Sequence, residues 1–521
     1  GILAACSTPD RPTDAPVSAP PAAVANTEQG PLDAAIAEHW RAAGVEPTAT
    51  ADDAEFLRRA SLDLVGRIPT ADEVQRFTAD ERPDKRAALV DDLLADDAWA
   101  EHWAEVLGDT LLGGAVQQRP AISQSLGTWI ERQLAAGAGW DDMTTAMLTA
   151  SGGADEANPA GFVVVHGRKN AVEALTGQTA RVFLGLQLQC AQCHDDPDDR
   201  FTQQQFYGLA AYYARTRARQ TKVDGVRVPR VVDKPRGEMR MPTEHDAPGD
   251  RSGARVAPAF PALVVTPRDD ETRRQTMARG IVGSPLFAKA AANHAWARLM
   301  GRGVVEPWDD LGGLDLPEHP AILETLAEDF IAHDYDLRHL LRTIVMSRAY
   351  QRSSAGQTDG TAARERVFAQ SALRPMSASQ LLRSLLVATG LEDTTGRGFR
   401  RQVARRRQQL RKEYAQAFDD DEMAAADTFS GNVPQALLLL NGELTNQGVT
   451  ATQGALAQLL ASTPDPGDRI DALYLRVYGR PPSAERREAL RRLVAERSDE
   501  PTVYQDLMHA MLASSEFVTI H

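Results

Sequence analysis

Cysteine is almost absent from this chain, since 521 residues contain only three. So few cysteines exclude a disulfide-rich scaffold, and they exclude a zinc site made of four thiolates. Two of them, Cys190 and Cys193, are separated by two residues, and His194 follows directly. The third, Cys6, lies near the start of the sequence. The chain therefore uses cysteine in only two places, and each requires a chemical explanation.

Several other features are missing. No apolar run approaches the roughly 18 residues of a membrane-spanning helix, and the apolar residues 436–441 are better explained as core. Signatures of nucleotide-binding loops, serine hydrolases and zinc proteases do not occur. The formal net charge of −15 argues against nucleic acid as a partner. Nothing outside the cysteine motifs specifies a chemical reaction.

The residues before Cys6 read Leu-Ala-Ala, which is the form of a bacterial lipobox. We expect residues 1–6 to be the end of a lipoprotein signal peptide, with Cys6 lipidated at a membrane; the alternative is a chance match. Residues 7–30 are rich in proline and poor in core-forming side chains, which predicts a disordered tether. Ser7 is not the aspartate that retains many lipoproteins at an inner membrane, which favours the outer membrane.

Three explanations compete for the Cys-x-x-Cys-His motif. Redox thiols at Cys190 and Cys193 usually accompany a βαβ pattern, which is not visible here. A structural role, or a vestigial motif, is a second possibility, although the further ligands of a zinc site are missing. Covalent attachment of haem c is the third. Two thioether bonds would anchor the porphyrin, and the imidazole of His194 would bind the iron. We expect haem c.

The flanking residues place the motif at a corner between two helices. A dense apolar pattern predicts a buried helix over residues 179–190. Thr202 and Gln205 have the spacing of a capping box that begins the next helix. Three aromatic side chains of that helix either form the wall of a cofactor site or belong to the ordinary core: Phe206, Tyr207 and Tyr213.

These segments resemble a known pair of families. Residues 183–215, "FLGLQLQCAQCHDDPDDRFTQQQFYGLAAYYAR", and residues 58–77 resemble the planctomycete-type cytochrome-like PSCyt domain. Four later segments resemble the PSD domain that commonly follows it: 284–312, 319–354, 432–444 and 473–485. Both families have no known function. The resemblance implies an exported bacterial protein with a cytochrome-like motif and implies no particular reaction.

Two positions depart from the family pattern. The stretch after the cysteines usually reads His-Asp-His-Pro-Phe-Asp, and here Asp196 replaces the second histidine. Any role of that histidine as a ligand or proton carrier is therefore in question. His294 stands where the PSD family usually has arginine. The chain resembles a divergent branch.

Frequent helix-stop and helix-cap signals predict a mainly α fold. We expect a helical PSCyt-like domain over residues 31–215 and a helical PSD-like domain over residues 272–521. Between them, residues 216–271 lose helical periodicity and form an irregular junction. Residues 222–233 alternate in polarity, which predicts a short β-hairpin.

The sixth iron ligand is predicted from position in the chain. Met239, Met241 and His245 lie together in the irregular junction, where a loop can fold back over a haem edge. His166, before the motif helix, is the second choice. A methionine or second histidine would set the potential, whereas an empty position would permit chemistry at the iron.

Other clusters favour ordinary explanations. The acidic group after the motif lacks the spacing of a calcium loop and is predicted to be a solvated loop or a charge at a helix N-terminus: Asp195, Asp196, Asp198 and Asp199. Residues 400–422 run from basic to acidic, typical of an exposed helix with internal pairing, with docking to an acidic partner as the alternative. His319, His333 and His339 lack metal-ligand spacing on one helix face.

Together these patterns predict an exported lipoprotein that binds haem c and transfers electrons or serves as a redox partner of another envelope protein. The alternative of a different class is a haem-free scaffold or binding protein with a structural Cys-x-x-Cys-His. A further alternative is a haem oxidoreductase with an open iron position. No nucleic-acid partner is expected.

Overall fold

The computed structural model describes most of the chain from Gly30 to His521. The predicted Pro-rich tether lies almost entirely outside the described part. The described residues are 30–113, 120–153, 157–166, 171–198, 200–223, 226–243, 252–312, 320–356, 360–391, 443–452, 454–497 and 500–521.

The described chain is mainly helical, which confirms the predicted fold class. Its first helices begin and end at residues suited to those positions. Asp52 accepts a hydrogen bond from the Glu55 N–H at the start of α2, and Thr70 forms a capping box with Glu73 at the start of α3. The five helices are α1 (Pro31–Ala43), α2 (Asp53–Val65), α3 (Ala71–Ala79), α4 (Lys85–Ala95) and α5 (Asp97–Leu112).

The predicted helix before the cysteines is shorter than expected. Helix α10 (Ala171–Leu184) ends at Gly185, which has a left-handed φ of 61°. A Cβ at Gly185 would lie 2.8 Å from Leu311 Cγ, so close packing requires glycine here. The chain then continues without regular secondary structure to the 3₁₀ turn η1 (Cys190–Gln192). Three more helices precede α10: α7 (Pro120–Ala135), α8 (Trp140–Thr149) and α9 (Gly161–Val165).

After the motif, helix α11 (Gln203–Ala210) begins at the predicted capping box of Thr202 and Gln205 and continues into η2 (Ala211–Tyr213). Strands β2 (Thr216–Val223) and β3 (Val226–Asp233) then pair antiparallel, which confirms the predicted hairpin and extends it. Strand β1 (Gly152–Gly153) joins β3, and β4 (Met239–Arg240) pairs with β5 (Arg255–Val256).

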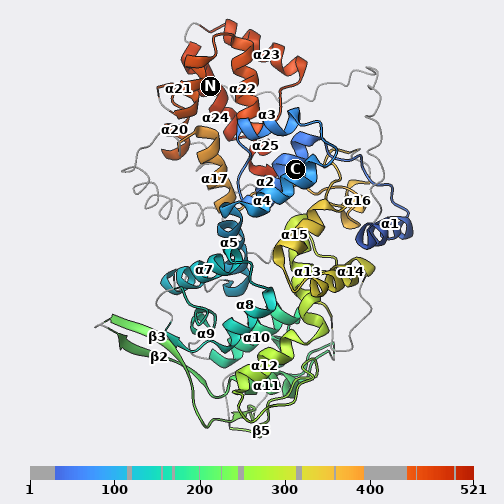
Figure 1. The fold of residues 1–521 in the computed structure, drawn as a ribbon, viewed down its shortest axis with the longest axis vertical. Helices are drawn as coiled ribbons and strands as arrows, with labels where there is room; N and C mark the ends of the chain where they lie inside the picture. The colour runs from blue at the N-terminus through green and yellow to red at the C-terminus, as the bar shows by residue number, and fades with distance from the viewer. Residues whose placement is uncertain are drawn as a thin grey trace.

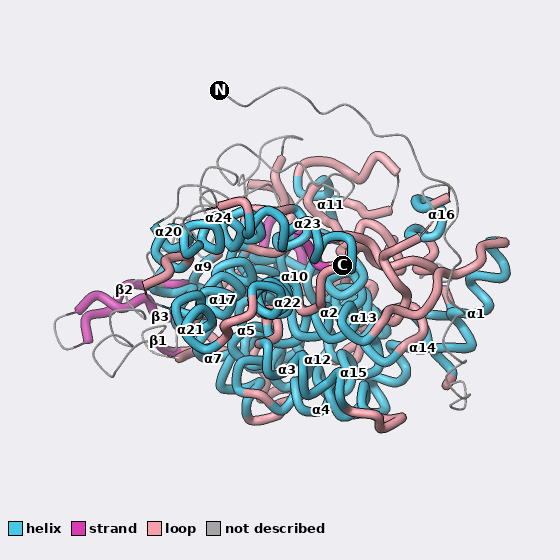
Figure 2. The backbone as a smooth tube through the Cα atoms, turned by 90° about the horizontal axis from the view of Figure 1, so that it is seen from above, coloured by secondary structure: helices cyan, strands magenta, loops and turns pink. Residues whose placement is uncertain are grey.

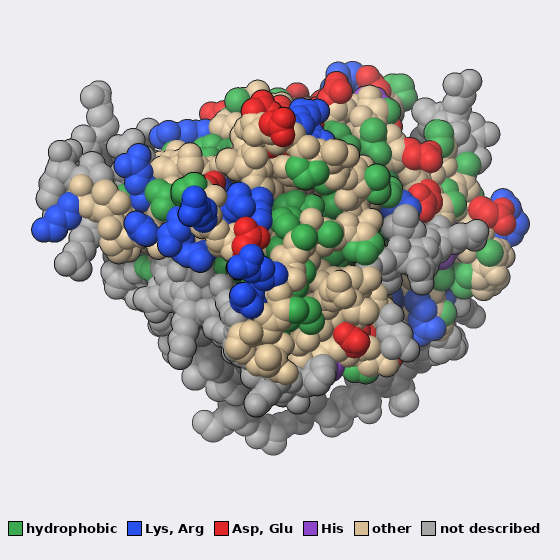
Figure 3. All heavy atoms as spheres, turned by 90° about the horizontal axis from the view of Figure 1, so that it is seen from below, with side chains coloured by type: hydrophobic (Ala, Val, Ile, Leu, Met, Phe, Trp, Pro, Cys, Tyr) green, Lys and Arg blue, Asp and Glu red, His purple; other side chains and the backbone are tan. Residues whose placement is uncertain are grey.

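The β2–β3 hairpin extends away from the helical body (Figures 1 and 2). Although the chain is acidic overall, Figure 3 shows Lys and Arg side chains gathered toward the side where this hairpin lies. Exposed basic residues of this region are Arg219, Lys222, Arg230 and Arg236.

The second half of the chain is again helical, and the predicted caps are present. Ser284 caps a helix that begins at Pro285 and ends before Gly301, and Ser377 forms a capping box with Gln380. The elements are α12 (Arg273–Val282), α13 (Pro285–Met300), α14 (Ala321–Ala332), α15 (Leu337–Met346), α16 (Thr361–Arg366), β6 (Arg374–Pro375), α17 (Ala378–Thr389), α20 (Glu443–Gly448), α21 (Gly454–Ser462), α22 (Pro466–Tyr478), α23 (Ala484–Ala495), α24 (Glu500–Leu512), α25 (Ser515–Val518) and β7 (Thr519–Ile520).

Two hydrophobic cores hold these elements together. The larger core runs from Leu32 to Ala369 and therefore takes residues from both sides of the β hairpin. The second core joins Leu62 and Ile68 to residues 376–520, and it lies in the upper part of the molecule in Figure 1. Helix α2 contributes to both cores. In the described part of the chain, no helix has both the length and the apolar character needed to span a bilayer.

Candidate functional site

The Cys-x-x-Cys-His motif lies at the molecular surface. Cys190 is exposed and Cys193 is partly exposed, and both thiols are free. The side chain of His194 is exposed as well. Both cysteines and the histidine fall within a single short turn, because η1 covers Cys190–Gln192 and the Cys193 N–H closes it on the Cys190 carbonyl at 3.3 Å.

The imidazole of His194 has a defined orientation. Its Nδ1 lies 2.7 Å from the backbone oxygen of Asp195, so Nδ1 carries the proton and donates it to that carbonyl. The other ring nitrogen, Nε2, then presents a lone pair. Metal-binding histidines usually have this arrangement, in which one nitrogen donates to a carbonyl and the other binds the metal.

Helix α11 holds the turn from behind. The Gln203 side chain donates to the Cys193 carbonyl at 2.8 Å and to the Gln192 carbonyl at 3.3 Å. The Tyr207 hydroxyl donates to the same Gln192 oxygen at 3.3 Å. The backbone of the motif is therefore fixed by buried side chains, while its thiols and imidazole stay accessible.

Two free thiols and an imidazole whose Nδ1 is already hydrogen-bonded fit the attachment chemistry of haem c.

The aromatic residues of the following helix form no open wall. Phe206, Tyr207 and Tyr213 are all buried in the larger core. The Tyr213 hydroxyl lies 2.9 Å from Thr179 Oγ1, and burial raises the pKa of this phenol well above its usual range. Their role is packing beneath the turn.

Asp196, which replaces the family's second histidine, is buried and fully partnered. One of its carboxylate oxygens accepts a hydrogen bond from the Asp198 N–H at 2.9 Å, and the other lies 3.5 Å from the Arg200 guanidinium. Arg200 also pairs with Asp310 at 2.7 Å. Asp196 therefore shapes the loop after the motif. The prediction that it is solvated is wrong, because its carboxylate is buried against Arg200 and the Asp198 N–H.

The segment around Asp310 connects this loop to the second half of the chain. Its neighbour Asp309 accepts hydrogen bonds from Arg181 at 3.1 Å and from Gln187 at 2.8 Å. The Leu311 N–H donates to the Gly185 carbonyl at 2.7 Å. The two segments that carry the family resemblances, 183–215 and 284–312, are thus in direct contact.

His294 belongs to this contact and is half-buried. Its Nε2 lies 3.0 Å from the Thr110 hydroxyl, and its ring packs on Trp308 with centroids 4.6 Å apart. Burial, with further contributions from Arg298 and Arg181, lowers the pKa of His294 to about 3. His294 is therefore neutral near pH 7, and the Arg181 guanidinium lies over the other ring of the pair, Trp308.

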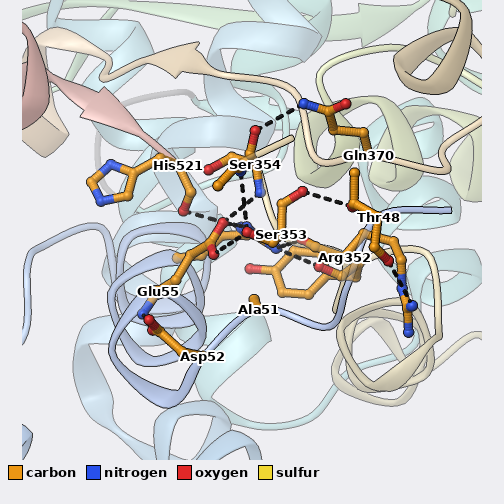
Figure 4. Close-up of polar contacts among 12 residues, drawn as sticks. Thr48, Ala51, Asp52, Glu55, Arg352, Ser353, Ser354, Gln370 and His521 are labelled. Carbon is orange, nitrogen blue, oxygen red and sulfur yellow. Dashed lines mark hydrogen bonds and ion pairs between the residues drawn. The ribbon is translucent and has the colours of Figure 1, made fainter. Parts of the chain in front are cut away.

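A second polar cluster joins α2 to the segment after α15 (Figure 4). Glu55 accepts hydrogen bonds from the Ser353 hydroxyl at 2.8 Å and from the Ser354 N–H at 2.6 Å. Arg59 pairs with Glu55 at 2.6 Å and donates to the carbonyl of Arg352 at 2.9 Å. Opposing charges lower the pKa of Glu55 despite its desolvation. These contacts hold residues almost 300 positions apart in one place.

The same helix buries a second carboxylate. Asp63 pairs with Arg374 at 2.7 Å and accepts a hydrogen bond from the Tyr350 hydroxyl at 2.7 Å. Arg58 donates to the carbonyls of Val477 and Phe517 at 3.2 and 2.8 Å. Sequence reasoning missed this cluster. The available signal was the pair of adjacent arginines, 58 and 59, between the apolar residues Leu57 and Ala60 of the helix.

The structure places the candidate sixth ligands as follows. Met239 is buried in the larger core, and Met241 packs against it. His245 lies outside the described residues, as does Cys6. His166 packs edge-on against Phe162, and its Nε2 lies 3.3 Å from the Leu111 carbonyl. Helix α11 contacts the motif turn η1 and also strand β4, which contains Met239. The identity of the sixth iron ligand stays a prediction.

Several weaker predictions fall partly outside the described chain, namely Asp199, His319 and residues 400–422. Asp195 accepts a hydrogen bond from the Gln203 N–H at 2.7 Å, at the first turn of α11. An acidic side chain is favourable at a helix N-terminus. His333 and His339 lack metal-ligand spacing on one helix face, but the structure brings their side chains together with that of Asp329.

Two family models match the chain. Residues 31–218 match PSCyt2, described as "Protein of unknown function (DUF1549)", and residues 273–494 match PSD1, described as "Protein of unknown function (DUF1553)". No curated protein matches the chain, and no solved structure does. The two matches follow each other in the order that the sequence resemblance implies. The chain belongs to the proteins in which a PSCyt2 domain precedes a PSD1 domain, both of unknown function.

Proposed function

We propose that the PSCyt2 domain carries haem c on Cys190, Cys193 and His194, and that the protein transfers electrons to or from another exported protein. One observation carries the proposal. Two free thiols and an oriented imidazole share one surface turn whose backbone is fixed from behind. The name of the PSCyt2 family agrees with a cytochrome-like role.

Each residue of the turn has a distinct task in this proposal. Cys190 and Cys193 form the thioether bonds, and His194 offers Nε2 because Nδ1 donates to the Asp195 carbonyl. Gln203 fixes the turn through the Cys193 carbonyl. When bound, haem would supply one-electron redox chemistry at this turn.

The proposal includes a location. The lipobox at Cys6 and the Pro-rich residues 7–30 support an exported protein held to a membrane by lipid, at the periplasmic side or cell surface. A Cys6→Ser protein, made with a complete signal peptide, should move to the soluble exported fraction. If the unaltered protein is already soluble and carries no lipid, the anchor is absent.

The haem proposal is tested by producing the full chain together with c-type maturation machinery. We expect a pyridine haemochrome spectrum and haem that stays attached on a denaturing gel. Cys190→Ser with Cys193→Ser should remove both signals, and His194→Ala should abolish the native spectrum. Cys6→Ser is the matched control, because it removes the one remaining cysteine and should leave haem unchanged. Protein that stays colourless under these conditions would refute the proposal.

A haem-free scaffold is the second candidate. It is supported by the aromatic residues beneath the turn, which are buried in the core and leave the motif without an open apolar wall. In that case the motif stabilises the loop that contacts Asp310 through Arg200. The same production experiment separates the two candidates. If haem is present, binding of CO to the reduced iron would favour an open oxidoreductase site over simple electron transfer.

A further inference from the structure

A tight turn between α14 and α15 brings together two histidines. His333 follows the last residue of α14, and its N–H donates to the Asp329 carbonyl at 3.1 Å. The next two residues, Asp334 and Tyr335, have positive φ angles of 52° and 55°, and they reverse the chain direction. His339 lies in the first turns of α15. The two imidazoles stack with centroids 3.6 Å apart and an interplanar angle of 17°.

Both imidazoles direct a nitrogen at one carboxylate. His339 Nε2 lies 2.8 Å from Asp329 Oδ2. His333 Nδ1 lies 3.3 Å from Asp329 Oδ1 and 2.8 Å from the backbone carbonyl of Asp329, so metal binding must also replace that backbone contact. One ligand atom from each of the three residues lies within 4.8 Å of the others. In a tetrahedral zinc site with bonds of about 2.0–2.1 Å, neighbouring ligand atoms are about 3.3 Å apart. The three ligand atoms are already close, but the stacked rings must separate and one imidazole must rotate before both lone pairs can point at one ion.

We propose that Asp329, His333 and His339 bind a divalent transition metal of the zinc class, with the remaining coordination open. Two imidazole nitrogens and one carboxylate oxygen are a frequent donor set for such ions. Binding requires that each nitrogen facing the carboxylate presents a lone pair, so its proton moves to the other ring nitrogen or leaves to water. The cation then takes the place of the protons that now join the imidazoles to Asp329.

Neighbouring side chains support a site with an open position. The Thr343 hydroxyl donates to Asp329 Oδ2 at 3.3 Å, and such outer contacts orient metal ligands. A surface hollow of about 510 Å³ reaches His339 and is also lined by Arg338 and Arg342. Arg342 is paired with Asp91 at 2.6 Å, whereas Arg338 Nε is buried without a hydrogen-bond partner among the described residues. Asp91 and Asp336 also line the hollow, so it contains charges of both signs and leaves His339 accessible from solvent.

The site is independent of the proposed haem. Asp329, His333 and His339 all lie between residues 329 and 339, whereas the cysteine motif lies at residues 190–194 on other elements. Free cysteine pairs can also bind zinc, so the experiment must separate the two places.

We suggest titrating metal-stripped full-length protein with Zn²⁺, and with Co²⁺ as a spectroscopic probe. The expected result is one ion per chain at this site, with Co²⁺ absorption of a nitrogen- and oxygen-ligated centre. His339→Ala and Asp329→Asn should each weaken Zn²⁺ binding by at least about 100-fold, and Thr343→Val should weaken it by about 10-fold. His333→Ala, at an exposed position, provides a variant in which loss of folding is not an issue.

The matched control is Cys190→Ser with Cys193→Ser and His194→Ala. This triple variant should keep the Zn²⁺ site and its Co²⁺ spectrum. The proposal is wrong if binding is lost in the triple variant and kept in His339→Ala and His333→Ala. It is equally wrong if the unaltered protein binds Zn²⁺ no more tightly than these two variants. A circular dichroism spectrum equal to that of the unaltered protein shows that each variant is folded.

Discussion

The turn at Cys190–His194 and the cluster around Asp63 both contain polar side chains. These side chains are accessible to solvent in the turn and buried in the cluster. The turn leaves two free thiols and an imidazole accessible, and only its backbone carbonyls accept bonds from buried side chains. Around Asp63, the carboxylate has Arg374 and the Tyr350 hydroxyl within about 3 Å, and Arg58 donates to backbone carbonyls. Exposed reactive atoms point to chemistry, and buried paired charges point to architecture.

We expect the largest effect on the free energy of unfolding in the buried cluster around Asp63. Asp63→Asn removes the charge that compensates Arg374, which is buried beside Tyr350. We expect a loss of about 3–5 kcal/mol in the free energy of unfolding, measured by urea denaturation, because an unpaired buried arginine remains. The exposed pair Asp91–Arg342 is the control. Asp91→Ala should cost about 0–1 kcal/mol. Equal effects at the two positions would contradict the comparison.

The next largest effect concerns how the free energy of unfolding depends on pH. Two histidines with strongly lowered pKa values should produce it. Burial lowers the pKa of His102 and of His294 to about 3, whereas the unfolded chain titrates near 6.5. As the pH falls below 6.5, the unfolded chain takes up protons that the folded chain does not, so stability decreases. Each histidine contributes up to about 1.4 kcal/mol per pH unit.

The measurement is urea unfolding between pH 6.5 and pH 5, where most carboxylates stay ionised. Replacing both residues with glutamine should flatten the dependence of stability on pH. A slope that stays the same in the double variant would show that these histidines do not resist protonation.

His102 also explains why position 66, at the end of α2, is glycine, since a Cβ there would lie 2.6 Å from His102 Nδ1.

A smaller effect tests whether the motif turn is held from behind. Gln203→Ala removes the bonds to the carbonyls of Gln192 and Cys193. We expect a loss of about 1 kcal/mol in stability and faster hydrogen exchange at the amides of the turn. Gln204 is the exposed neighbour in the same helix. Gln204→Ala should change neither quantity measurably, and an equal change would mean that Gln203 does not hold the turn.

The smallest stability effect is expected at the cysteines themselves. Cys190→Ser with Cys193→Ser should change the unfolding free energy of haem-free protein by less than about 0.5 kcal/mol, because surface substitutions rarely do more. Both thiols should also react with iodoacetamide in native haem-free protein. A destabilisation above 2 kcal/mol, or thiols that react only after unfolding, would favour the structural role of the motif.

The features predictable from the sequence were local ones. The cysteine motif, the capping boxes at Thr202 and Ser377, and the hairpin are each encoded within a few residues. Helix α10 was predicted to continue to residue 190 because Leu186 and Leu188 are apolar. Both are buried, but they lie in irregular backbone after Gly185, where the helix ends at a left-handed φ and the chain packs closely on Leu311.

The features that sequence reasoning missed depend on distant partners. Asp63 and Tyr350 are 287 positions apart, so their hydrogen bond has no local signature. His333 and His339 do not share one helix face, and the turn with positive φ angles at Asp334 and Tyr335 brings them together. Residues in such turns are hard to recognise when none of them is glycine.

The central claim is that the exposed turn carries a cofactor and the buried cluster does not. Its most direct test is the intact mass of full-length protein made with and without c-type maturation machinery. Our account predicts a mass increase of one haem with the machinery, lost in Cys190→Ser with Cys193→Ser and kept in Cys6→Ser. An unchanged mass in protein whose turn thiols remain free and reactive would contradict it.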